Sequence, residues 1–408
     1  MKVLQINAVY GRGSTGTIVR DIENLCEKSG IECYVASPDP KVREAKRGYV
    51  IGNVLDHKLH AFLSRIHGKQ AYYSHLPTRN LLHWIDEIKP DIVHLHNLHS
   101  NFIHLNMLLQ YLSKRDIKTI ITLHDCWFFT GGCFHYTVVG CSKWLTDCKG
   151  CPKRNSDTPA FLGKKSAQIL ADRKKYLLAI PHLCITSVSE WIAHEALKTF
   201  LKDTPNHVIH NGIDMEVFKP TKSDFRQRLL LKDKYVILGP ASKWLLPVNR
   251  EVLSRFVQQM QPDEVLLLFG ISTNRQLSYL NSINLPKDKI RTYGYTKNRE
   301  ELAQLYTMAD CFANTTREDS MSLINVEAQA CGTPVVTFDQ TGPKETVDNK
   351  NSFSVLVGNV DKLYDAIHKV RQQHTKTKQQ ELLRFVANNY EVKATYQKYI
   401  DLFKSLSL

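Results

Sequence analysis

Long hydrophobic runs are missing from this chain of 408 residues. No stretch of about 18 apolar residues occurs, so we expect no membrane-spanning helix. The first residues, MKVLQINAVYGRG, are interrupted by Gln5 and Asn7 and show no small-residue cleavage site. They predict a first strand and not a secretory signal peptide. Without such a signal, the ten cysteines indicate a reducing compartment with free or metal-bound thiols. We therefore expect a cytoplasmic protein.

Common phosphate-binding and metal-binding motifs are missing too. The first strand is not followed by G-x-G-x-x-G or by a P-loop. No Asp-x-Asp pair stands in a suitable loop, so we expect no metal cofactor for catalysis. Acidic residues are outnumbered, 40 against 54 Lys and Arg, which gives a formal net charge of +14. Such a surface suits anionic partners: nucleic acid, anionic lipid or a phosphorylated substrate.

Strand and helix patterns alternate along the whole chain. This alternation predicts an α/β protein with two doubly wound domains, each close to 200 residues long. The segment that organises the rest is residues 315–334, TTREDSMSLINVEAQACGTP. It predicts a loop, one helix and a turn into a buried strand. Ser320 or Ser322 is a candidate helix cap, and Gly332 a candidate residue to end the helix. We expect the apolar side chains Leu323, Ile324 and Val326 to face a sheet.

Two acids flank the start of this predicted helix. Asp319 stands in the loop, with Glu318 beside it, and Glu327 lies eight residues after Asp319. The free amides of a helix N-terminus hold phosphate or sugar hydroxyls, and a carboxylate can accept both hydroxyls of a ribose. On spacing alone, a surface helix with solvated acids fits equally well.

A glycine-rich turn, Gly11-Arg12-Gly13-Ser14-Thr15-Gly16, follows the first strand and precedes a helix. Glycines let a ligand approach the backbone, and the helix amides can face a phosphate. A tight structural turn explains the same residues. Farther along, a strand over 118–123 ends in His124-Asp125. Ligands meet open α/β sheets at the carboxyl ends of strands, so His124 can contact a sugar hydroxyl or take a proton.

A cysteine-rich insertion spans residues 126–152. Cys148 and Cys151 form a C-x2-C half-site, and Cys133 with Cys141 would complete a tetrahedral thiolate set for structural zinc. Reduced thiols without metal are the alternative. A basic segment over 161–180 is predicted to form an amphipathic helix. Its lysines and arginines, Arg173 among them, could meet an anionic membrane surface, or the helix could be an ordinary surface helix.

The 315–334 stretch resembles the E-x7-E signature of retaining family-4 glycosyltransferases, with Asp319 where Glu is usual. The HNGID segment at 210–214 resembles the crossing between that family's domains. Residues 120–152 are similar to a subgroup that builds bacterial polysaccharides, of the colanic-acid type. The resemblance implies a GT-B fold, two Rossmann-like domains facing a central cleft. The domains would be 1–214 and 215–390, with a last helix at 391–408 packing on the first.

The resemblance also implies residue roles. His124, Asp319 and Glu318 would be catalytic. Donor-binding residues would be Gly13, Ser14, Thr15, Gly16, Lys243, Arg250, Tyr295, Ser320, Met321, Ser322, Leu323 and Glu327. Family members hold the donor diphosphate with an Arg and a Lys in the loop after the strand near 235. Lys243 resembles the first of these. Pro247-Val248-Asn249-Arg250 replaces the usual second, so Arg250 is its candidate substitute.

The resemblance therefore implies transfer of a hexosyl unit from a nucleoside diphosphate sugar to a saccharide or lipid-linked saccharide. The expected location is cytoplasmic, with peripheral attachment to the inner leaflet as an option. Two alternatives stay open: a sugar-nucleotide hydrolase or epimerase on the same fold, and a zinc-stapled nucleic-acid-binding protein. The second is not expected, because the chain has no interleaved aromatic and basic stripe.

Overall fold

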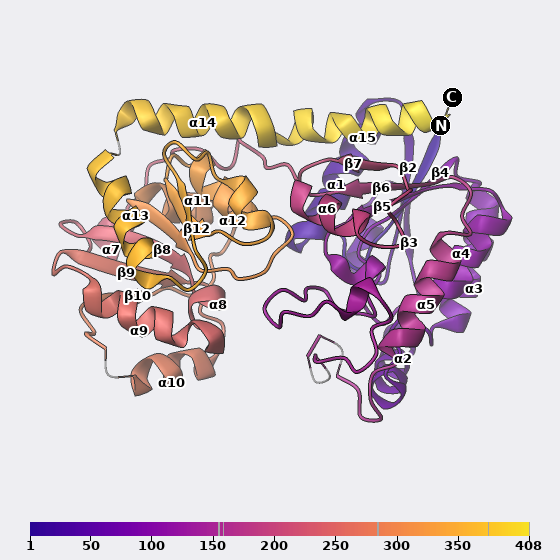
Figure 1. Cartoon of the computed structure of the whole chain (residues 1–408). Helices are drawn as coiled ribbons and strands as arrows, with labels where there is room; N and C mark the ends of the chain where they lie inside the picture. Colours follow the sequence, from indigo (N-terminus) through magenta and orange to yellow (C-terminus); the bar gives the residue numbers. More distant parts are fainter. Residues whose placement is uncertain (154–155, 158, 284, 374, 408) are drawn as a thin grey trace. The chain divides into compact units, whose positions relative to one another are not determined.

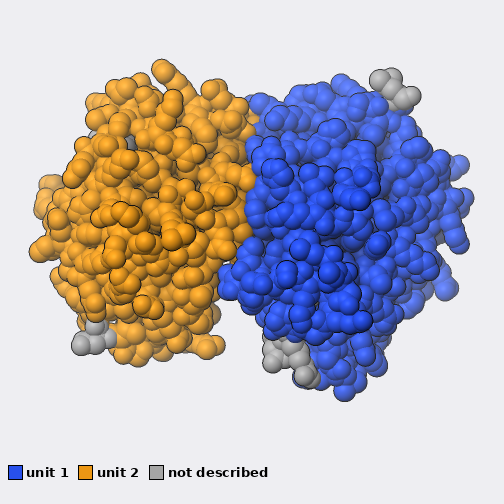
Figure 2. All heavy atoms as spheres, in the orientation of Figure 1, with its two compact units in different colours: residues 1–212, 393–408 blue, residues 213–392 orange. Residues whose placement is uncertain are grey.

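The computed structural model describes residues 1–153, 156–157, 159–283, 285–373 and 375–407. Two compact units divide the chain, one of residues 1–212 with 393–408 and one of residues 213–392 (Figure 2). The sequence placed the division after residue 214. Leu408, the last residue of the C-terminal helix expected over 391–408, lies outside the described residues. None of the described helices is both long and apolar enough to cross a membrane.

Unit 1 is built on a parallel sheet of seven strands in the order β3-β2-β1-β4-β5-β6-β7 (Figure 1). The strands are β1 (Lys2–Ile6), β2 (Glu32–Ser37), β3 (Gly48–Val50), β4 (Ile92–Leu95), β5 (Lys118–Leu123), β6 (Leu183–Ser187) and β7 (Asn206–Val208). Its helices are α1 (Gly13–Lys28), α2 (Val54–His67), α3 (His75–Ile88), α4 (Leu105–Lys114), α5 (Ser166–Leu177) and α6 (Glu190–Leu197). Strands that are buried along their whole length, such as LCITS in β6, are typical of parallel sheets covered on both faces.

Unit 2 repeats this plan with six parallel strands in the order β10-β9-β8-β11-β12-β13. The strands are β8 (Tyr235–Pro240), β9 (Glu264–Phe269), β10 (Ile290–Thr292), β11 (Cys311–Asn314), β12 (Val335–Phe338) and β13 (Phe353–Val355). The helices are α7 (Phe225–Arg228), α8 (Ala241–Trp244), α9 (Arg250–Gln259), α10 (Asn274–Ser282), α11 (Arg299–Met308), α12 (Leu323–Ala330), α13 (Val360–Gln373) and α14 (Lys376–Tyr390). The described residues also form short 3₁₀ helices, namely η1 (Pro40–Glu44), η2 (Cys126–Phe129), η3 (Lys143–Leu145), η4 (Pro247–Asn249) and η5 (Gly342–Thr346).

The last helix, α15 (Val392–Ser407), contributes to unit 1 although it ends the chain. The Tyr396 hydroxyl accepts a hydrogen bond from the Gly212 amide at 3.1 Å. The Tyr399 hydroxyl lies 3.2 Å from the Thr122 hydroxyl, and its ring lies beside that of His94, with centroids 5.2 Å apart and planes tilted by 38°. These contacts join α15 to β4 and β5.

Each sheet reverses its strand order once, at β1 and β4 in unit 1 and at β8 and β11 in unit 2. In open parallel sheets, the loops beyond the carboxyl ends of strands at this reversal form the ligand-binding crevice. The topology therefore predicts that ligands bind at the loops after β1, β4, β8 and β11.

Candidate active site

The loop after β11 leads into α12 at the strand reversal of unit 2. The helix begins at Leu323, and Gly332, with φ +81°, follows its end as predicted. Ser322 occupies the N-cap position, but its side chain makes no capping bond. Its hydroxyl instead accepts a hydrogen bond from the Asn314 amide at 3.0 Å, which ties the helix start to β11. The predicted capping by a serine side chain is therefore wrong.

The face that α12 buries differs from the one expected. Val326 is fully buried, but Leu323 and Ile324 are only half-buried. Asn325 and Gln329 are fully buried instead, and both hydrogen-bond to Thr346 in η5, by its hydroxyl and its carbonyl. The expected burial is therefore confirmed for Val326 but is only partial for Leu323 and Ile324, because hydrogen-bonded amides make up part of the buried face.

Asp319 is held just before α12. Its amide donates to the Thr341 hydroxyl at 3.2 Å, and its carboxylate accepts a hydrogen bond from the Met321 amide at 3.4 Å. A Cβ on Gly342 would lie 1.7 Å from the Ser320 carbonyl oxygen, so only glycine fits there. Asp319 and its neighbour Glu318 are half-buried, whereas Ser320, Met321 and Ser322 are buried. The backbone thus fixes a carboxylate beside the helix N-terminus, the arrangement that the sequence suggested.

Glu327 lies in the second turn of α12 and is half-buried. Its Oε2 accepts a hydrogen bond from the Tyr306 hydroxyl of α11 at 3.0 Å. Burial raises the pKa of Glu327 to about 7, although the Tyr306 hydrogen bond and the charge of Arg299 act in the other direction. A carboxylate with such a shift at the strand reversal is a functional-site candidate, because ligand hydroxyls can supply the hydrogen bonds that its charged form lacks.

The second loop of this site follows β8 and contains Lys243, which is half-buried in α8. Asn249 is fully buried and organises the region: its amide donates to the carbonyls of Lys243 and Thr315, both at 2.9 Å. One side chain therefore joins the loop after β8 to the loop after β11.

Arg317 completes this junction, and the sequence reasoning missed it. Its Nε donates to Asn249 Oδ1 at 2.6 Å and its Nη2 to the Val248 carbonyl at 3.2 Å. Arg250, the predicted cation, begins α9, is exposed and stacks over the Tyr279 ring at 4.5 Å. Arg317 is thus the basic side chain bonded to the Lys243 loop. Its place in the TTRED run, two residues before Asp319, was the only available signal.

Tyr295 follows β10 and is 74% exposed. Its neighbour Tyr293 donates its hydroxyl to Glu301 at 2.9 Å. Among the described contacts, none fixes the Tyr295 ring, so its role with a nucleotide base stays a prediction.

In unit 1, the glycine-rich residues form the first turn of α1. The helix begins at Gly13, so Ser14, Thr15 and Gly16 lie inside it and not in a preceding loop. The Gly11 amide donates to the Gly16 carbonyl at 2.9 Å, and a Cβ on Gly16 would lie 3.2 Å from the Gly11 nitrogen. Gly16 therefore has a packing role, while Gly13 and Ser14 are exposed at the helix N-terminus.

His124, directly after β5, belongs to a hydrogen-bonded chain. Gln5 Nε2 donates to the Val19 carbonyl at 3.1 Å, which orients the amide so that Gln5 Oε1 accepts from His96 Nε2 at 3.1 Å. His96 Nδ1 lies 3.0 Å from His124 Nε2. Burial lowers the pKa of both imidazoles, to about 4 for His124. Both rings are then neutral at pH 7, and His124 carries its proton on Nε2 and offers Nδ1 as an acceptor.

The other residue of the His-Asp pair has a separate partner. Asp125 lies 3.2 Å from His99 and accepts a hydrogen bond from the Trp127 amide at 2.8 Å. Burial opposes its ionisation, but these contacts outweigh it and lower the pKa of Asp125. Gln5 and His96, which sequence reasoning did not single out as partners of His124, therefore set its proton position, while Asp125 fixes the following η2.

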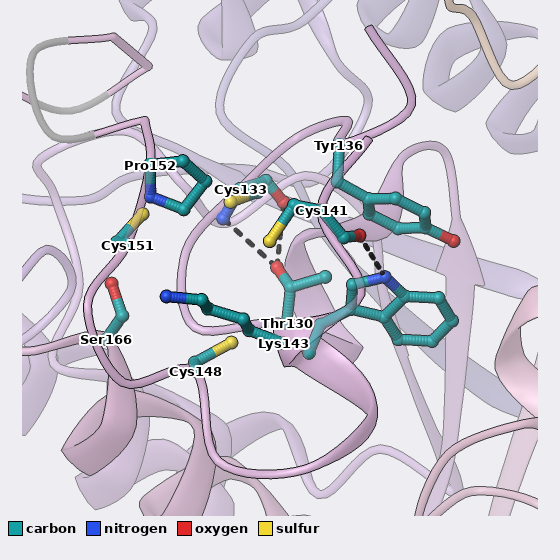
Figure 3. A pocket seen from close by; sticks show the side chains of 10 residues that line it. Thr130, Cys133, Tyr136, Cys141, Lys143, Cys148, Cys151, Pro152 and Ser166 are labelled. Atoms are coloured by element: carbon teal, nitrogen blue, oxygen red, sulfur yellow. Dashed lines mark hydrogen bonds between the residues drawn. The ribbon is translucent and has the colours of Figure 1, made fainter. Parts of the chain in front are cut away.

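The four cysteines of the insertion line one pocket of about 10 Å³, shown in Figure 3. Cys133 and Cys148 are buried, and Cys141 and Cys151 are half-buried. Within the described ranges, no group of three or more Cys, His, Asp or Glu side chains is close enough to hold a metal ion. The pocket brings the four predicted cysteines to one place, but not within the distance that a shared metal ion needs, and zinc there stays a prediction.

The basic segment after the insertion differs from the expected amphipathic helix over 161–180. The helix, α5, spans only 166–177, and Arg173 is 2% exposed. Its guanidinium lies 3.8 Å from the Trp127 ring centre and donates to the carbonyls of Trp127 and Thr130. Of the two alternatives for this helix, membrane contact is wrong for Arg173, because its side chain is buried and stabilises the base of the cysteine insertion.

Comparison with known proteins gives the same two-part division. Residues 15–217 match the family described as Glycosyltransferase Family 4, and residues 250–391 match Glycosyl transferases group 1. The chain carries two glycosyltransferase domains. A relative from Escherichia coli K12, named "Putative colanic acid biosynthesis glycosyl transferase WcaC", is 22% identical over 273 residues. That alignment covers 65% of this chain and 64% of the relative.

Solved structures agree with these two glycosyltransferase domains over nearly the whole chain. Sucrose-phosphate synthase from Thermosynechococcus elongatus superposes with a TM-score of 0.70 at 15% identity, covering 99% of this chain and 98% of that one. Anabaena HepE, in complex with UDP-glucose, gives 0.64 at 16% identity and covers 99% and 100%. The fold is GT-B, as the resemblance implied.

Proposed function

We propose that this protein is a retaining glycosyltransferase. It moves a hexosyl unit from a nucleoside diphosphate sugar to a hydroxyl of a saccharide or lipid-linked saccharide, in the synthesis of a cell-surface polysaccharide. The observation that carries the proposal is the α12 start at the strand reversal of unit 2. There, Asp319 accepts a hydrogen bond from the Met321 amide beside the N-terminus of α12, and Glu327 has a raised pKa.

Each group has a role that its chemistry suits. Glu327 accepts the ribose hydroxyls. Asp319, or Glu318, and the amides of residues 320–323 hold the transferred sugar. Lys243, with Arg317 or Arg250, offsets the negative charge that develops on the departing diphosphate. In unit 1, His124 accepts a hydrogen bond from a sugar hydroxyl through Nδ1, and the first turn of α1, Gly13–Gly16, binds phosphate or acceptor.

Two properties of the related proteins support the details of the proposal. HepE was solved with UDP-glucose, so UDP-sugars are the first donors to test. The name of the E. coli relative points to polysaccharide synthesis. We place the reaction in the cytoplasm, where sugar nucleotides are the donors, and at the inner leaflet if the acceptor is lipid-linked.

The test is thermal stabilisation of the full chain by a panel of UDP-, GDP-, ADP- and CMP-sugars. A ligand that binds only the folded protein raises its melting temperature by mass action. We expect one nucleotide family to stabilise the wild-type protein and to have no effect on Glu327→Ala. The donor site is contradicted if no nucleotide sugar raises the melting temperature. It is also contradicted if the melting temperature of Glu327→Ala rises as much as that of the wild type.

Product analysis separates the alternative reactions. With donor and acceptor present, NMR of the anomeric proton reports whether the configuration of the donor is kept. Free sugar or an epimerised donor, formed at the same rate without acceptor, would favour a hydrolase or epimerase instead.

A further inference from the structure

Helix α2 exposes its largest apolar side chains, and the two residues that it buries fully are polar. Its buried residues are His60 and Ser64. His60 accepts a hydrogen bond from the Ala71 amide at 3.1 Å, so its other nitrogen donates to the Ser74 hydroxyl at 2.6 Å. Burial lowers the pKa of His60 to about 3, which keeps the ring neutral. These hydrogen bonds fix His60 to the segment that follows α2, whereas the apolar Leu63 and Ile66 are only half-buried.

The opposite face of α2 exposes large apolar side chains. Val54 is 65% exposed, Leu55 76%, and Leu59 and Phe62 58% each. Their spacing of one, four and three residues keeps them on one side of the helix. A surface helix of a soluble domain normally turns its apolar side to the core. Helix α2 instead turns these large apolar side chains to the solvent.

Further apolar side chains extend this surface at both ends of α2. Phe161 and Leu162, 73% and 69% exposed, donate their amides to the carbonyls of Arg65 and Ile66 in the last turn of the helix. At the other end, Leu76 is 61% exposed, and its neighbour Pro77 packs against Gly52. We call this set the α2 face: Val54, Leu55, Leu59, Phe62, Leu76, Phe161 and Leu162.

Basic side chains stand within the α2 face. Lys58 and Arg65 are exposed on the same side of the helix, and Lys165 is exposed after Leu162. The one acid of α2, Asp56, is half-buried and accepts a hydrogen bond from the Asn53 amide in a capping box. Exposed Leu and Phe with Lys and Arg suit an anionic membrane surface, whereas protein interfaces are depleted in Lys.

We propose that the α2 face docks the protein on an anionic phospholipid bilayer, with its apolar side chains among the acyl chains and Lys58, Arg65 and Lys165 against the headgroup phosphates. The net charge of +14 attracts the whole protein to such a surface. Docking requires neither donor nor acceptor. It can therefore be tested independently of the proposed glycosyl transfer.

The test is flotation of the full chain with vesicles of phosphatidylcholine alone or with about one-third phosphatidylglycerol. We expect the protein to float with the anionic vesicles only. Leu55→Gln with Leu59→Gln and Phe62→Gln should abolish flotation. The control, Leu230→Gln with Leu356→Gln, changes side chains that are 88% and 70% exposed in unit 2, and should float like the wild type.

Charge-reversal variants test the membrane docking in a second way. Lys58→Glu with Arg65→Glu should lower the partition coefficient about fivefold or more for each basic residue reversed. Lys222→Glu with Lys287→Glu changes the net charge equally through exposed lysines of unit 2 and should have a much smaller effect. An unchanged melting temperature in each variant shows that it is folded.

Three outcomes overturn the proposal. The first is that wild-type protein floats with neither vesicle. The second is that the α2 variants float as well as their controls. The third is that sedimentation velocity shows a wild-type dimer that the triple Gln variant converts to monomer without any vesicle binding, which assigns the α2 face to a second copy of this chain.

Discussion

Single side chains set the chemistry that this protein can perform. Glu327 has a pKa near 7 because its carboxyl group is desolvated beside Tyr306 of α11, and His124 has a defined proton position because Gln5 and His96 precede it in a hydrogen-bonded chain. Asn249 brings Arg317 to the Lys243 loop. Each of these effects depends on a partner that is distant in the sequence.

The raised pKa of Glu327 makes stability depend on pH. The folded state keeps the proton up to about pH 7, whereas the unfolded chain releases it near the ordinary glutamate pKa of 4.5. The stabilising contribution is therefore complete below about pH 4.5 and is lost as the pH rises through 7. Relative to wild type, Glu327→Gln should gain up to about 3 kcal/mol in free energy of unfolding between pH 4.5 and pH 8. Urea unfolding at both pH values measures this, and an equal difference at both would contradict the shift.

We predict different losses of donor affinity when Arg317 and Arg250 are each replaced by alanine. Loss of a charge-assisted hydrogen bond to a diphosphate costs roughly 1.5–3 kcal/mol, or about tenfold to hundredfold in affinity. We expect this loss for Arg317→Ala and little change for Arg250→Ala, whose side chain stacks on Tyr279. Calorimetric titration with the free nucleoside diphosphate decides between them, and the reverse ranking would return the role to Arg250.

The proton position of His124 is directly measurable. With ¹⁵N-labelled histidine, the His124 signals, identified by their loss in His124→Gln, should show a protonated Nε2 and an unprotonated Nδ1 at pH 7. Gln5→Leu removes the acceptor that orients His96 and should mix the two tautomers of His124. A wild-type spectrum with the proton on Nδ1 would refute the chain from Gln5 to His124.

Three elements distinguish this chain from a plain pair of Rossmann-like units: the cysteine insertion and the helices α2 and α12. The cysteine insertion rests on Arg173 of α5. Helix α2 exposes its apolar side, and α12 buries amides. All three are local departures from the usual apolar-inside pattern, and each coincides with a proposed site.

We propose that Cys133, Cys141, Cys148 and Cys151 bind one structural zinc ion, since all four line the same pocket. Purified protein should contain about one zinc per chain, as in other four-thiolate sites. Cys148→Ser with Cys151→Ser should lose the metal and lower the melting temperature, whereas Cys184→Ala, in β6, should keep it. Mass spectrometry of the metal content checks this, and zinc-free wild-type protein whose thiols all react would refute the site.

For the whole molecule, the charge of +14 fits nucleic acid as well as lipid or phosphorylated substrate. We expect only weak binding to mixed-sequence nucleic acid at physiological salt, because electrostatic binding alone decreases steeply with salt. Fluorescence anisotropy with labelled single-stranded and double-stranded DNA and RNA tests this. Tight binding that persists under these conditions would favour the alternative of a nucleic-acid-binding protein.

The sequence by itself determined the α/β class and the position of the main elements. The strand over 118–123 has the predicted bounds, and Gly332 ends α12 because only glycine adopts its positive φ without strain. Such features follow from local backbone preference and apolar periodicity. The acids Asp319 and Glu327 were also visible, because their spacing along one chain segment sets their geometry.

Only the tertiary structure decided what surrounds these residues. Arg317 reaches the Lys243 loop through Asn249, which lies 68 positions away in the sequence, and Arg173 is buried by Trp127, 46 positions away. Helix α2 buries His60, whose partners are Ala71 and Ser74, and exposes apolar side chains on its opposite side. Burial and partner choice depend on contacts between distant segments, and no local pattern encodes them.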